Sequence, residues 1–230
     1  LCLGEPPHQF TWRYKDKDGK LWVSAFDVES FIIDIRDYIV QKYPLPDLRN
    51  QLKANPAINS LCKDEDGIFW FSQDRYGLCI YDSRKEKLKH YSQCQGTRNL
   101  PFGDVTNIAR SYNHNWIWAT SYGPTVFGLS QQNMEMKEDV RIELGNVTNN
   151  PGLITSLFED PQNNLWIGTT TGLFVYRIMS ATLESIPEVS GPVAGITQTA
   201  DSRIWTVIRN KGIYRIEQDK GIESYPFDKD

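Results

Sequence analysis

The chain has 230 residues, 23% of them charged, and its formal net charge is −4 at pH 7. This charge gives no electrostatic support to nucleic-acid binding, which depends on Lys and Arg neutralising phosphates. The sequence has no apolar run near 18 residues, so it predicts no transmembrane helix. It begins Leu1-Cys2-Leu3-Gly4, without an initiator Met or a signal peptide, and we therefore expect part of a longer chain.

Five tryptophans recur along the chain and divide it into units. The intervals between Trp22, Trp70, Trp118, Trp166 and Trp205 are 48, 48, 48 and 39 residues. A fixed period of this size indicates one supersecondary unit that is stacked repeatedly. We expect units at approximately 5–50, 51–98, 99–147, 148–190 and 191–230.

In the first two units, short apolar runs separated by turn residues predict strands. In the second unit these runs are 58–62, 68–72, 78–81 and 88–91, with a turn at 63–67 that ends in Asp66-Gly67. The first unit fits the same template, with strands beginning near Phe10 and including Trp22, 31–34 and Tyr43. Residues 28–43 also resemble an amphipathic helix, but the register with the second unit favours strands.

The last three units follow the same template. The third keeps Val105, Ile108 and Trp118 and has its third strand at 125–129, and it is the most degraded of the five. Strands in the fourth are expected at 154–160, around Trp166 and at 172–176. In the fifth they are expected at 193–201, around Trp205, at 212–216 and at 222–226.

Four short antiparallel strands per unit, with no helix between them, are typical of the blades of a β-propeller. The sequence therefore predicts an all-β fold with five four-stranded blades in this chain. The tryptophan of each second strand is expected to lie buried between neighbouring blades, where a large ring fills the wedge. A row of sugar-stacking tryptophans is the alternative, but the regular spacing is what packing requires.

The fourth unit resembles a known repeat. Its phrases 154–160 (ITSLFED), 164–169 (NLWIGT) and 172–176 (GLFVY) are similar to the two-component-regulator propeller repeat, roughly I-x-x-I-x-E-D-x-x-G-x-L-W-I-G-T-x-x-G-L-x-x-Y. Residues 58–81 also match well, the first and fifth units match moderately, and the third matches weakly. The resemblance covers nearly the whole chain, but the repeats of this family carry no catalytic motif from which functional residues could be transferred.

The resemblance implies a function as well as a fold. Such repeats form the extracytoplasmic sensor half of hybrid histidine kinases in the inner membrane of Bacteroides-like bacteria, which often detect oligosaccharides. We therefore expect a periplasmic, ligand-sensing module that recognises an oligosaccharide, cut from a seven-bladed or longer array. The expected partners are a second propeller and further domains of the same protein, and a homodimer of that protein is possible. Two alternatives stay open: a carbohydrate-active hydrolase or lyase with a propeller fold, and a non-enzymatic protein-interaction propeller.

The residues themselves favour a binding module over an enzyme. The three histidines, His8, His90 and His114, fall in different units, and the sequence contains no H-E-x-x-H motif. The acidic turns 16–19 and 64–67 lack the further oxygen ligands that a calcium loop needs. We therefore expect no catalytic residue, metal or cofactor.

The four cysteines, at positions 2, 62, 79 and 94, are expected to be free thiols. Cys62 and Cys79 belong to the first and third strands of the second unit, and a whole strand separates them. That separation is about 9–10 Å, which exceeds the reach of a disulfide.

A propeller usually binds ligands on the face formed by the loops between its second and third strands and by the connections between blades. Function concentrates in loops of varied length on a repeated scaffold. Four residues of this face are candidates because aromatic faces and guanidinium groups suit sugar rings and sugar carboxylates: Arg75, Tyr76, Tyr122 and Arg209. Trp12 is a fifth candidate, because its register partners on the other inner strands are small or polar. Ordinary surface packing is the alternative for the first four, and for Trp12 the alternatives are filling the central channel or contacting another domain.

Overall fold

The computed structural model describes residues 10–15, 20–25, 31–34, 39–42, 58–64, 66–73, 77–82, 84–85, 87–91, 104–132, 135–217 and 221–227. Side chains are described from Ser60 onward, except at Gln73 and Gln132. Among these residues no helix is long and apolar enough to cross a bilayer.

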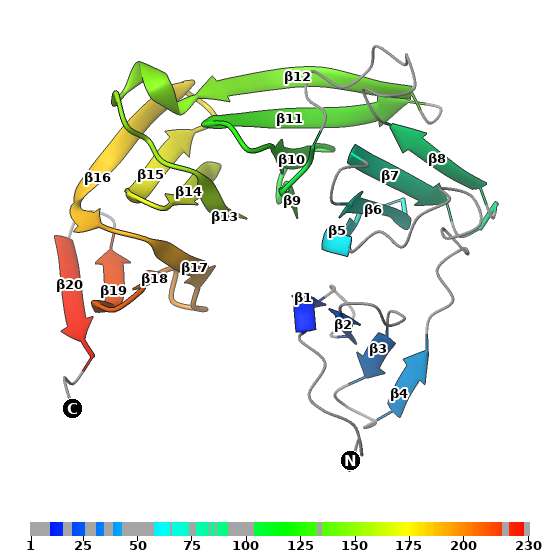
Figure 1. The fold of residues 1–230 in the computed structure, drawn as a ribbon, viewed down its shortest axis with the longest axis horizontal. Coiled ribbons are helices and arrows are strands. Elements are labelled where there is room, and N and C mark those ends of the chain that lie inside the picture. Colours follow the sequence, from blue (N-terminus) through cyan, green and yellow to red (C-terminus); the bar gives the residue numbers. More distant parts are fainter. Residues whose placement is uncertain are drawn as a thin grey trace. The chain divides into compact units, whose positions relative to one another are not determined.

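The described chain forms five four-stranded antiparallel sheets in which consecutive strands pair (Figure 1). The first sheet contains β1 (Phe10–Lys15), β2 (Lys20–Ala25), β3 (Phe31–Asp34) and β4 (Ile39–Lys42). The second contains β5 (Ile58–Lys63), β6 (Ile68–Gln73), β7 (Gly77–Asp82) and β8 (Lys87–Tyr91). The third contains β9 (Asn107–Arg110), β10 (Ile117–Thr120), β11 (Thr125–Gln132) and β12 (Glu135–Glu143).

A single 3₁₀ turn, η2 (Leu144–Asn146), follows β12 in the described chain. The fourth sheet contains β13 (Ile154–Glu159), β14 (Asn164–Thr169), β15 (Gly172–Arg177) and β16 (Thr182–Ser190). The fifth contains β17 (Val193–Gln198), β18 (Ile204–Ile208), β19 (Gly212–Glu217) and β20 (Gly221–Pro226). The predicted fold class is confirmed, and β3 and β4 show that 28–43 contains strands rather than a long helix.

The chain divides into two compact units. The first unit comprises residues 1–108 and 133–136, and the second comprises 109–132 and 137–230. The first and second sheets belong to the first unit, and the fourth and fifth sheets belong to the second.

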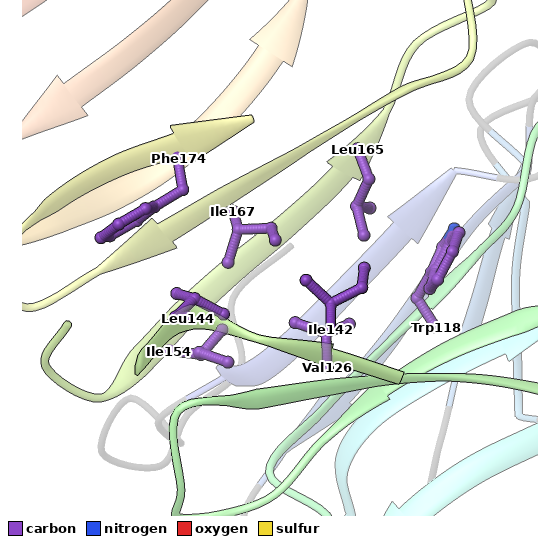
Figure 2. Packing of buried hydrophobic residues seen from close by; sticks show 8 residues of the cluster. All are labelled: Trp118, Val126, Ile142, Leu144, Ile154, Leu165, Ile167 and Phe174. Carbon is purple, nitrogen blue, oxygen red and sulfur yellow. The ribbon is translucent and has the colours of Figure 1, made fainter. Parts of the chain in front are cut away.

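In the second unit, apolar cores lie between successive sheets. Trp118 packs with residues of the third sheet and with Ile154, Leu165, Ile167 and Phe174 of the fourth (Figure 2). Trp166 packs in the same way with residues of the fifth sheet, including Val193, Ile204 and Ile208. The prediction that the tryptophans lie buried between blades is confirmed for these two.

The other repeat tryptophans give a mixed result. Trp70 is buried, with 1% of its surface exposed. Trp205 is only half-buried, contrary to the prediction. The side chain of Trp22 is outside the described part of the chain.

A β-bulge recurs at one place in the innermost strand of four sheets. The pairing with the second strand shifts between Phe10 and Trp12, Ile58 and Ser60, Ile154 and Ser156, and Val193 and Gly195. Since an extra residue bends the strand locally, the repeated bulge gives each blade the same inner edge. The predicted register of Trp12 with small or polar residues of other inner strands is confirmed for the backbone at Ser60, Ser156 and Gly195.

Side chains near these bulges link neighbouring inner strands. The Ser60 hydroxyl donates to the Ile108 carbonyl at 3.0 Å and accepts from the Ile108 N–H at 3.2 Å. The Thr155 hydroxyl donates to the Val193 carbonyl at 2.8 Å. Polar side chains at this edge thus join one blade to the next.

Candidate ligand-binding surface

The acidic residues of the turns between first and second strands are part of the scaffold. One oxygen of Asp64 accepts from the Ile68 N–H at 2.9 Å, and the other accepts from the Trp70 indole at 2.8 Å. Asp160 holds the Trp166 indole at 2.8 Å in the same way. The predicted turn chemistry at 64–67 is confirmed, with Gly67 at φ +80°. These carboxylates are therefore already hydrogen-bonded to the turn and its tryptophan.

Burial raises the pKa of Asp64 above its ordinary value, and the hydrogen bonds from Trp70 and Ile68 oppose this shift. The sequence did not reveal the indole contact, because the aspartate and the tryptophan are six residues apart and meet only through the turn. The aspartate and the tryptophan have the same spacing in the second and fourth sequence repeats, and this is the signal that would have identified the contact.

In the third blade, the indole N–H of the tryptophan has a different hydrogen-bond partner. Its turn has Tyr112 at the position of the aspartate, and the Trp118 indole instead donates to Glu159 of the fourth sheet. Glu159 also accepts from the Asn113 N–H at 3.3 Å. In the fifth blade the Trp205 indole N–H donates to the Thr199 hydroxyl at 3.3 Å.

At the opposite ends of the strands of the second unit lie the loops in which ligand contacts were predicted. We call them the loop surface, which consists of residues 121–124, 147–153, 170–171, 191–192 and 209–211. Antiparallel strand order places the loops between second and third strands and the connections between sheets at this same end. The hydrogen bonds between these segments confirm the placement.

Backbone hydrogen bonds join the loop surface from the fourth sheet to the fifth. The Thr170 N–H donates to the Leu153 carbonyl at 2.9 Å, and the Gly191 N–H donates to Thr171 at 2.8 Å. The Arg209 N–H donates to the Pro192 carbonyl at 2.9 Å. Such loops are held before any ligand arrives, which lowers the entropic cost of binding.

Close packing adds to this order at Gly152. Its φ is +73°, and a Cβ atom there would lie 2.5 Å from the Thr170 hydroxyl oxygen. Only glycine fits this position without strain. The connection between the third and fourth sheets is thereby fixed against the loop 170–171.

Two of the five predicted site residues lie on the loop surface. Tyr122 follows β10 and is 59% exposed, and Arg209 follows β18 and is exposed. They occupy equivalent loops of the third and fifth sheets, and the loop 170–171 of the fourth sheet comes between these sheets in the chain. Arg75 and Tyr76 are outside the described residues. The backbone of Trp12 lies in β1, but its side chain is not described.

Sequence reasoning missed two further residues of the loop surface. Leu153 is 51% exposed beside Thr170. Lys211 lies two residues after Arg209, and its ammonium group donates to the carbonyl and hydroxyl oxygens of Ser190 at 2.8 and 3.1 Å. The short spacing between Arg209 and Lys211 in one loop was the signal that would have identified the lysine.

Two further observations concern chemistry at the buried cysteines and at metal sites. Cys62 and Cys79 are buried thiols outside any disulfide, as predicted, whereas Cys2 and Cys94 are outside the described residues. Burial raises the pKa of the Cys79 thiol. The described side chains include no group of three or more His, Cys, Asp or Glu placed to hold a metal ion.

Comparison with protein families identifies the repeat in the fourth sheet. Residues 150–171 match the two component regulator propeller family. The match covers β14 and the parts of the loop surface on either side of it. It confirms the resemblance that the sequence predicts for this repeat. A comparison with curated proteins finds no match.

Solved structures similar to the whole chain are β-propellers with low sequence identity. The extracellular domain of a protein of B. thetaiotaomicron assigned as a hybrid two component system is 16% identical over 98% of this chain, with a TM-score of 0.62. A second such domain from the same organism is 15% identical over 96%, with a TM-score of 0.65. A gluconolactonase of Xanthomonas campestris is 12% identical over 86%, with a TM-score of 0.62.

These likenesses establish the propeller fold but not a shared activity. The chain spans 36% and 33% of the two extracellular domains and 68% of the gluconolactonase. It therefore corresponds to about a third of the length of each of the two extracellular domains.

Proposed function

We propose that this chain is a ligand-sensing propeller module of a hybrid two-component histidine kinase, located in the periplasm, and that it recognises an oligosaccharide on the loop surface. The observation that carries the proposal is the repeat at 150–171, which matches the regulator propeller family and also forms part of the loop surface. The similar extracellular domains of B. thetaiotaomicron support the same assignment.

The loop surface offers the chemistry that a sugar requires. An exposed aromatic ring at Tyr122 can stack on the apolar face of a pyranose, and the guanidinium group of Arg209 can donate in a bidentate manner. The hydroxyl group of the exposed Thr170 provides a further polar contact. We propose that Arg75, Tyr76 and Trp12 contribute to recognition in the same protein.

An enzyme is the second candidate, because a gluconolactonase shares the propeller fold. The carboxylates Asp64, Asp160 and Glu159 are each hydrogen-bonded to a tryptophan indole, which favours a structural role for them. We therefore propose that the segment has no catalytic activity. Turnover of an oligosaccharide or a sugar lactone that one carboxylate substitution abolishes would overturn this part of the proposal.

The binding proposal is tested by calorimetric titration of the protein with a panel of neutral and acidic oligosaccharides. Replacing Tyr122 with Ala removes the stacking ring, and we expect a roughly threefold to tenfold weaker affinity. Tyr112→Ala is the matched control, because Tyr112 is 61% exposed at the other end of the same sheet. Equal affinities for the wild type and Tyr122→Ala would remove this residue from the site.

A further inference from the structure

The charges on the loop surface are all of one sign. Arg209 and Lys211 are the charged residues within its five segments, and those segments contain no Asp or Glu. The whole chain, by contrast, has a net charge of −4. The loops at the other end of the fourth and fifth sheets carry Asp160 and also Asp201, which is paired with Arg203. The second unit therefore has one loop end that attracts anions.

The acidic groups nearest to the loop surface along the chain lie on the outermost strands. Glu143 is the last residue of β12 and already accepts from the Thr125 hydroxyl at 2.6 Å. Glu188 lies near the end of β16 and is exposed. Arg209, by contrast, is bonded through its N–H to Pro192, the residue just before the innermost strand β17. The positive charge thus lies toward the inner strands.

The two cations have different roles in this loop. Two of the three ammonium N–H groups of Lys211 are used on Ser190, at the end of β16. The Arg209 guanidinium group makes no hydrogen bond or ion pair with any described residue. Its backbone is nevertheless fixed by Pro192, and the following Asn210 has φ +60°. The backbone of Arg209 is therefore held in place, and no described residue occupies the donors of its guanidinium group.

We infer that the oligosaccharide bound at the loop surface is anionic, with a carboxylate or sulfate group held by Arg209 beside the fixed charge of Lys211. This inference rests on the proposed function and specifies its ligand class. A planar guanidinium group matches either anion in a bidentate manner, and such charge-assisted bonds are about twice as strong as neutral ones. Because the site is exposed, its affinity should fall as salt is added.

The test compares three tetrasaccharides of similar length by calorimetry at low and physiological salt. They are tetragalacturonate, which carries carboxylates, a sulfated carrageenan tetrasaccharide, and the neutral β-1,4-galactotetraose. We expect at least one anionic probe to bind more tightly than the neutral one. Arg209→Ala should weaken that binding about 10- to 100-fold, and Arg209→Lys should weaken it less.

Lys87→Ala is the matched control, because it removes one exposed positive charge from the outer strand β8 of the second sheet. It should leave the affinity unchanged. Circular dichroism checks that each variant is folded, which we expect because Arg209 is exposed.

The outcomes separate this inference from the proposed function. If neutral and anionic probes bind equally, and Arg209→Ala has no effect, the anionic assignment is wrong while oligosaccharide sensing stands. If no probe binds the wild type, both are overturned. A preference for tetragalacturonate over the carrageenan fragment, or the reverse, identifies the anion.

Discussion

The repeat tryptophans do two things at the scale of a single residue. The ring of Trp166 fills the space between the fourth and fifth sheets, and its indole N–H is satisfied by Asp160. A buried indole needs such a partner, because an unpaired polar group inside a protein costs free energy. The aspartate also accepts backbone N–H groups of the turn at 160–164. One residue pair therefore stabilises both the turn and the interface.

Replacing Trp166 with Ala should lower the free energy of unfolding by about 3–5 kcal/mol, because it empties an enclosed site in an apolar cluster. Trp205→Ala is the matched control, since that ring is only half-buried. Urea unfolding monitored by circular dichroism measures both. Similar losses for the two variants would contradict the packing role assigned to Trp166.

Asp64 gives a prediction that depends on pH. Its folded pKa lies above its unfolded value because of burial, so its contribution to stability is fully present below the unfolded pKa and is lost as pH rises through the folded pKa. Asp64→Asn removes this titration but keeps an acceptor for one N–H. The stability of the wild type relative to the variant should therefore rise as the pH is lowered from 7 to 4. Urea unfolding at four pH values checks this, and a constant difference would rule it out.

The period of the tryptophans was enough to predict where Trp118 and Trp166 lie, because packing follows from spacing and ring size. It was not enough to predict what their indoles bond to. Glu159 reaches Trp118 from the following sheet, 41 residues away, and no local pattern encodes that contact. Trp205 was wrongly predicted to be buried, because its repeat phrase is present whether or not another sheet covers it.

At the scale of strands and sheets, close approach between blades depends on small residues at particular positions. Gly168 of β14 faces Ser156, and a Cβ atom there would lie 2.3 Å from the serine hydroxyl oxygen and 2.5 Å from a Val193 methyl carbon. All six residues of β14 are buried, because sheets cover both of its faces. In β18 buried and half-buried residues alternate, and the buried residues Ile204 and Ile208 pack with Trp166 of the fourth sheet.

Gly168→Ala should therefore destabilise the protein by roughly 1–3 kcal/mol through overpacking. Gly195→Ala in β17 is the matched control, because a Cβ atom there meets nothing within 4 Å. We expect that change to stay within about 0.5 kcal/mol of the wild type. Thermal unfolding of both variants compares them, and a neutral Gly168→Ala would show that Ser156 and Val193 can move apart.

Strand positions were largely predictable, because apolar runs separated by Asp, Asn and Gly define them in every unit. The lengths of β11 and β12 were not. β11 extends to Gln132, past the predicted end of the third strand at 129, and β12 begins at Glu135. Their outer residues are mostly polar, so hydrophobic periodicity did not mark where pairing ends. The loop surface was predicted from topology, but Lys211 and Leu153 were identified only from their contacts and exposure.

At the scale of the whole molecule, the outer face of the fifth sheet differs from the equivalent face of the fourth. In the strand register of the fifth sheet, Arg215 lies opposite Trp205. The equivalent residue opposite Trp166 in the fourth sheet is Val175. The guanidinium group of Arg215 lies over the Trp205 ring and bonds Glu223 at 2.8 Å, while Arg203 bonds Glu217 at 2.9 Å. The ion pairs cover one end of this face. Apolar side chains at the other end stay exposed, namely Ile213, Tyr225 and Phe227.

We expect this partly apolar face to make the protein associate with itself reversibly, because exposed sheet faces of this kind usually pack against another surface. Ile213→Glu places a charge in the apolar end and should shift the protein toward monomer. Met179→Glu is the matched control, because Met179 is 79% exposed in the turn between β15 and β16, away from this face.

Sedimentation velocity between about 1 and 100 micromolar measures the association, with affinities in the weak range expected for a contact of limited area. A wild-type protein that stays monomeric throughout this range would show that the fifth sheet is already adequately covered, by its own ion pairs or by another part of the chain.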